Sequence, residues 1–69
     1  MAISREFQNR FKDLSDDKDY KTKTELAKQM GITYVTFSKI YNYGIIPKFK
    51  VLIRIADYFD ISVEYLLCM

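Results

Sequence analysis

Residues Lys23 to Asn42 constrain the fold more than any other part of this 69-residue chain. They read KTELAKQMGITYVTFSKIYN, with apolar or small residues at helical spacing on both sides of Met30-Gly31-Ile32-Thr33. The two sets are Leu26, Ala27 and Met30, then Phe37, Ile40 and Tyr41. This spacing predicts two short amphipathic helices that share one core across a turn of about four residues. Because glycine lacks a Cβ, Gly31 suits a left-handed residue at the end of the first helix.

The rest of the chain predicts three further helices, so the expected fold class is all-α with no strand. The first helix is expected from about Ile3 to Leu14, with Ser4 as its N-cap. The polar stretch Ser15 to Asp19 is expected to form a loop, and Tyr20 beyond it to pack back on the core. The second helix begins at Thr22, which with Glu25 forms a capping box.

The expected third helix is capped by Thr33 and runs from Tyr34 to about Asn42. The fourth covers roughly Lys48 to Phe59, with Pro47 suited to its first turn, and Ser62 caps the fifth. Only 2 Gly and 1 Pro leave little room for long loops, and 49% apolar residues exceed what a disordered chain carries. We therefore expect a single domain over residues 1–69.

No apolar run approaches the roughly 20 residues of a membrane span, and charges interrupt the apolar pattern of the N-terminus, which excludes a signal peptide. We therefore expect no membrane association and a cytoplasmic location. The single Cys68 cannot form an internal disulfide, in keeping with a reducing compartment.

The net charge of +2 conceals an uneven distribution along the chain. Seven Lys or Arg and one acid, Glu25, lie between Lys21 and Arg54, whereas the remaining acids lie on either side. A polyanion would be attracted to the middle of the chain and repelled by its ends.

The two central helices resemble the helix-turn-helix of the Cro and lambda-repressor-like (Xre-type) family. The later segment PKFKVLIRIADYFDISVEYLL is similar to the fourth and fifth helices of that family, so the resemblance covers Thr22 to Leu67. Its usual core positions are occupied by Phe49, Leu52, Ile55, Ala56, Phe59, Ile61 and Leu66. The resemblance implies a compact five-helix lambda-repressor-like domain whose second and third helices form the helix-turn-helix. The chain departs from the family in the seven-residue polar connection before Thr22 and in having Lys21 where an apolar residue is common.

The resemblance also implies that the partner is double-stranded DNA, with the helix from Tyr34 in the major groove. Base-edge contacts would come from Tyr34, Val35, Ser38 and Lys39. Phosphate contacts would come from Thr22, Lys23, Thr33, Thr36, Asn42 and Lys48. Lysine can donate to guanine O6 and N7, and valine methyls can contact a thymine methyl. Free N–H groups at a helix start suit a phosphate.

We further expect a homodimer on an inverted repeat, because one recognition helix reads only a few base pairs. The expected fourth helix has more apolar surface than one core face requires, and the family commonly dimerises near its last helix. The predicted interface is Val51, Tyr58, Val63, Leu66 and Leu67, together with Cys68 and Met69.

No catalytic, cofactor-binding or metal-binding residues are predicted. The chain has no His to act as a general base, and one Cys without His cannot build a structural zinc site. Three interpretations remain: a DNA-binding regulator, in particular a repressor; an antitoxin-like adaptor or other protein-interaction module on the same fold; and an enzyme. The residues specify neither the operator nor an effector.

Overall fold

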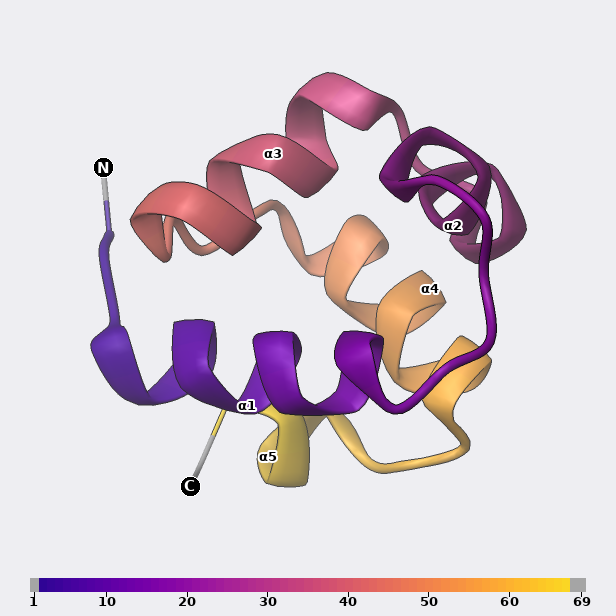
Figure 1. The fold of residues 1–69 in the computed structure, drawn as a ribbon. Helices are drawn as coiled ribbons and strands as arrows, with labels where there is room; N and C mark the ends of the chain where they lie inside the picture. Colours follow the sequence, from indigo (N-terminus) through magenta and orange to yellow (C-terminus); the bar gives the residue numbers. More distant parts are fainter. Residues whose placement is uncertain (1, 68–69) are drawn as a thin grey trace.

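The computed structural model describes residues 2–67, which fold into five α-helices (Figure 1). Their bounds are α1 Arg5–Asp16, α2 Lys23–Met30, α3 Tyr34–Tyr43, α4 Phe49–Phe59 and α5 Val63–Leu66. Within this part of the chain there is no strand, only one isolated antiparallel bridge between Ile3 and Ile45. The predicted all-α fold is confirmed. None of the described helices is long and apolar enough to cross a membrane.

Four helices begin at the polar caps that the sequence predicts. The hydroxyl oxygens of Ser4, Thr22, Thr33 and Ser62 each accept the backbone N–H three residues later, at 3.0–3.2 Å. Each bond satisfies one of the N–H groups that have no partner inside the helix, and so stabilises the helix start by about 1 kcal/mol. The caps therefore define where these helices start.

Two glycines let the chain turn sharply after α2 and α3. Gly31 has φ +78° and Gly44 has φ +69°, the left-handed region that other residues avoid. At Gly44 the extended N-terminal segment also passes close by: Ser4 N–H donates to Gly44 O at 3.0 Å, and Ile46 N–H donates to Ala2 O at 2.9 Å. The end of α3 is thereby fastened to the segment that precedes α1.

One hydrophobic core joins all five helices. Phe11 of α1 lies at its centre, with its ring 5.3 Å from that of Phe37 and 6.3 Å from that of Phe59. Ala27 of α2 is 1% exposed, and its small side chain allows the close approach of α2 to its neighbours. Tyr20 packs against this core from the α1–α2 connection, as predicted. The core therefore fixes the position of α3 relative to α1, α2 and α4.

The first helix and the polar loop after it differ from the prediction. Helix α1 starts two residues later, at Arg5, and continues to Asp16, so that Ser15 is helical. Ile3, the expected first residue of the helix, precedes α1, is 67% exposed and forms the bridge to Ile45 instead. Ser15 is fully buried, and its Oγ has no hydrogen-bond partner. The continuation of α1 carries this serine into the core.

The start of α4 also corrects the prediction. Lys48 is the N-cap and Pro47 precedes it, so the proline lies outside the helix. Phe49 was expected in the core but is 65% exposed. Leu52, Ile55, Ala56 and Phe59 fill the buried face of α4, and Phe49 lies beside that face, where none of the described segments covers it.

Candidate nucleic-acid interface

The outer face of helix α3, opposite its buried side, carries both polar and apolar side chains. Phe37 and Ile40 are buried, and the residues on the opposite side are Val35, Lys39 and Asn42, at helical spacing. Val35 is 62% exposed, so its two methyl groups face solvent. The Asn42 amide donates to Ser38 Oγ at 2.9 Å. The outer face thus combines a methyl surface, a cation and a linked amide–hydroxyl pair.

At the start of α3 two threonine hydroxyls form a chain. Thr33 Oγ1 accepts from Thr36 N–H at 3.2 Å and donates to Thr36 Oγ1 at 3.0 Å. The hydroxyl hydrogen of Thr33 is therefore used in a hydrogen bond within the protein. The hydroxyl hydrogen of Thr36 is not used in either of these two bonds. Both threonines are predicted to contact phosphate, and of this pair Thr36 is the better placed to donate to an anion.

Tyr34 combines exposure with a structural contact. Its side chain is 47% exposed, and its ring stacks on Phe37 with a centroid distance of 6.4 Å and an angle of 16°. The ring thus extends the core towards solvent and leaves about half of its surface open at the first position of α3.

The start of α2 lies against Tyr41 of α3, a contact that the sequence does not reveal. Lys23 Nζ is 3.9 Å from the centre of the Tyr41 ring, and Lys12 Nζ of α1 is 5.3 Å away. The Tyr41 hydroxyl donates to Asp16 Oδ1 at 2.9 Å. Burial raises the pKa of Tyr41, and the adjacent Asp16 carboxylate raises it further by accepting its hydrogen bond and by its charge.

This cluster shows that the charge segregation along the sequence is incomplete in space. Asp16 belongs to the acidic stretch, but the length of α1 brings it to the end of α2 that carries Lys23. The α2 start remains exposed at both Thr22 and Lys23. Lys23 is therefore accessible to an anion, although its ammonium group already has an aromatic partner.

A groove runs between α3 and the connector to α4. Thr36 and Lys39 line one side, Lys48 and Val51 the other, and the floor is apolar. Three of these residues, Thr36, Lys39 and Lys48, are predicted DNA contacts. The fold brings them together from positions up to 12 residues apart. Two ammonium groups beside one groove favour an extended anion such as a phosphodiester strand.

Two further hydrogen bonds fix α4 against α2 and the α2–α3 turn. Arg54 Nη1 donates to Gly31 O at 2.9 Å, and the Tyr58 hydroxyl donates to Gln29 Oε1 at 2.7 Å. Arg54 therefore holds the turn that positions α3, a role that no local pattern around Arg54 indicates.

A sequence model of the Cro/C1-type HTH DNA-binding domain matches residues 3–68. The chain belongs to this family. Comparisons with curated proteins and with solved structures find no match. The family resemblance seen in the sequence is confirmed, and the family binds DNA rather than catalysing a reaction. In this HTH domain, α2 and α3 are the helix-turn-helix.

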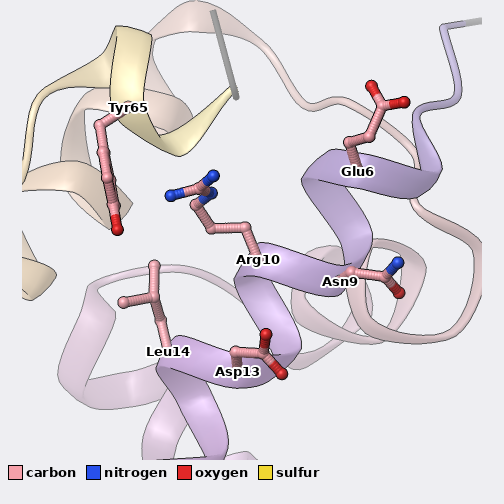
Figure 2. A pocket seen from close by; sticks show the side chains of 6 residues that line it. All are labelled: Glu6, Asn9, Arg10, Asp13, Leu14 and Tyr65. Atoms are coloured by element: carbon pink, nitrogen blue, oxygen red, sulfur yellow. The ribbon is translucent and has the colours of Figure 1, made fainter.

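The far side of the HTH domain carries a separate pocket between α1 and α5 (Figure 2). The Arg10 guanidinium lies 4.1 Å from the centre of the Tyr65 ring, and Glu6, Asn9, Asp13 and Leu14 complete the lining. Figure 1 shows α5 on the side of the molecule away from α3. This pocket is therefore separate from the face of α3 that holds the predicted DNA contacts.

The residues predicted for a dimer interface are mostly engaged within the HTH domain. Leu66 is fully buried in the core and presents no surface to a partner, which corrects its sequence-based assignment. The other four, Val51, Tyr58, Val63 and Leu67, are half-buried and pack against the core. Cys68 and Met69 lie outside the described residues. The most exposed apolar side chain of α4 is instead Phe49, which was not assigned to the interface.

Proposed function

We propose that this HTH domain is a sequence-specific regulator of transcription, a repressor that inserts α3 from Tyr34 into the major groove of an inverted-repeat operator. The observation that carries the proposal is the outer face of α3. Val35 and Lys39 project from it, directly opposite the buried Phe37 and Ile40. The major groove of B-DNA admits an α-helix, and a helix whose outer face offers donors and methyl groups suits base edges.

Within this face, each side chain has a matching feature of the base pairs. Lys39 can donate to guanine O6 and N7, and the Val35 methyls can contact the methyl group of thymine. The Ser38 hydroxyl already accepts a hydrogen bond from the Asn42 amide. The two side chains are therefore partly ordered before binding and lose less conformational entropy on contact with DNA. Tyr34 supplies a half-exposed ring at the N-terminal end of α3, the end that enters the major groove in this proposal.

The phosphate contacts follow from the start of α2 and from the groove beside α3. The first N–H groups of α2 have no partner inside the helix, and the helix dipole favours an anion there. Thr22 and Lys23 lie at this point. On the other flank, Thr36 and Lys48 line the groove, and Thr33 holds the Thr36 hydroxyl in place. Such contacts orient α3 without reading sequence.

We propose a homodimer because one α3 spans too few base pairs for useful selectivity. Two copies on half-sites about one helical turn apart would double the number of bases read. Occupancy of an operator is sufficient to exclude competing proteins, so repression requires no surface beyond those described.

The test compares Lys39→Ala with Lys23→Ala on an operator selected from a random duplex pool. Lys39→Ala should cost about 1–3 kcal/mol on the preferred site and relax the choice of base at one position, because it removes a base contact. Lys23→Ala should weaken binding to all duplexes alike and lower the slope of log affinity against log salt by roughly one, because it removes a phosphate contact.

Fluorescence anisotropy on matched and scrambled duplexes at several salt concentrations measures both effects. Lys28→Ala is the matched control, since Lys28 is an exposed lysine in the last turn of α2, away from its N-terminus. If both variants bind like the parent, α3 does not read DNA. The protein-interaction module would then be the better interpretation.

A further inference from the structure

One face of α4 is exposed and carries apolar residues that the HTH fold does not use. Phe49 is 65% exposed and Ile53, one turn later, is 39% exposed. Lys50 and Asp57 are exposed on the same face, since positions i, i+1, i+4 and i+8 of a helix lie within one half of its circumference. Two large apolar side chains one turn apart thus form an apolar strip between a basic and an acidic end.

The charges of α4 are arranged against its own dipole. A helix favours acids at its start and bases at its end, but α4 has no acid in its first turn and no base in its last. Instead Lys48 and Lys50 lie at the start, and Asp57 and Asp60 lie at the end. Lys48 also makes no side-chain capping bond. This order is unfavourable within one helix and becomes favourable beside a second helix that runs the opposite way.

We propose that this face of α4 binds the same face of a second copy of the chain, with the two α4 helices antiparallel and a two-fold axis near Ile53. Lys50 and Asp57 lie three and four residues on either side of Ile53. The axis therefore brings Lys50 of each copy beside Asp57 of the partner subunit. Ile53 packs on its own counterpart, and Phe49 covers the edge of the contact.

A second copy fits this surface better than another protein does, because the surface is complementary to itself. A two-fold interface requires one patch that pairs with its own copy, and a strip with a basic and an acidic end meets that requirement. The next positions around α4 beyond Lys50 are Arg54 and Tyr58, and these are occupied by their contacts with the turn and with α2. The interface therefore leaves the helix-turn-helix free.

This inference rests on the proposed homodimer and replaces the interface that the sequence suggests. A single helix face is smaller than the roughly 800 Å² per partner of a standard interface, so the free dimer is weak. On an operator, two bound copies are held side by side, which raises their effective concentration and completes the dimer.

Sedimentation equilibrium of the whole chain without DNA, over a range of protein concentrations, tests the interface. Ile53→Asp should raise the dimer dissociation constant at least about tenfold, because it buries a carboxylate against its own copy. Lys50→Asp and Asp57→Lys should each weaken the dimer by about three- to tenfold, because like charges then meet across the axis. The double variant Lys50→Asp/Asp57→Lys restores the pair and should return to within about threefold of the parent.

Val35→Asp is the matched control, since Val35 is 62% exposed but lies on α3. It should lose operator binding and dimerise like the parent, which separates failure of DNA reading from failure of this interface. Circular dichroism shows whether each variant is folded. If Ile53→Asp does not fold, the charge reversals at the exposed positions Lys50 and Asp57 still test the interface. A monomeric parent at all concentrations, an unaffected Ile53→Asp dimer, or a double variant no better than the single reversals would each overturn the proposal.

Discussion

Replacing each of the two turn glycines by alanine separates backbone strain from a close approach of two chain segments. Gly31 and Gly44 both have positive φ, so alanine is strained at either position. Their surroundings differ. A Cβ at Gly31 would lie 3.3 Å from Arg54 Nη1, the end of a flexible side chain. A Cβ at Gly44 would lie 2.8 Å from the backbone oxygen of Ser4, which cannot move independently of the chain.

The expected costs follow from these contacts. Gly31→Ala should lower the free energy of unfolding by about 1–2 kcal/mol, the cost of a left-handed non-glycine residue. Gly44→Ala has the same strain and must also push back the N-terminal segment. That shift disrupts the bonds Ser4 N–H to Gly44 O and Ile46 N–H to Ala2 O. Two net hydrogen bonds add about 1–3 kcal/mol, so we expect a total of about 2–5 kcal/mol.

Urea denaturation followed by circular dichroism measures both variants, and an unchanged m value shows that the denatured state is comparable. Gly31→Ala is the control for Gly44→Ala. If the two variants are destabilised equally, to within about 0.5 kcal/mol, the pairing of the N-terminal segment with the end of α3 contributes nothing to stability.

Two further substitutions test groups that only the fold reveals. Ser15→Ala should raise the free energy of unfolding by about 1 kcal/mol in urea denaturation, because it removes a fully buried hydroxyl without a hydrogen-bond partner; destabilisation would show that this oxygen is satisfied. For Tyr41, the raised pKa means that above about pH 10 the unfolded chain loses this proton before the folded one does, so stability falls as pH rises. Tyr41→Phe should reduce that alkaline fall in unfolding experiments from pH 8 to 11, and an identical pH profile would contradict the assigned cause.

The sequence by itself determined the features that depend on neighbouring residues. Caps act across three residues, so Ser4, Thr22, Thr33 and Ser62 could be identified from residue type and position. Helical periodicity identified Leu26 and Phe37 as core residues, and the family resemblance added Ile55. The outer face of α3 follows from the same periodicity, because a residue opposite the buried stripe must face outwards.

Tertiary structure decided the features that depend on which helices meet. Ser15 reads as a loop residue, but α1 continues two residues further than expected, to Asp16, and Ser15 is buried. Phe49 reads as a core residue, yet the neighbouring helices leave it exposed. Periodicity gives the direction of a side chain relative to its own helix, whereas burial also requires a neighbour on that side.

The same limit applies to the candidate site. The contact of Lys23 with Tyr41 and the bond from Tyr41 to Asp16 join residues 18 and 25 positions apart, and no local pattern encodes either. Nor does local spacing place Arg54 on Gly31 O. Sequence alone could therefore name the helix that we propose to face DNA. Which side chains hold that helix in place was decided by the packing of α1, α2 and α4 around it, since such contacts exist only once the chain has folded.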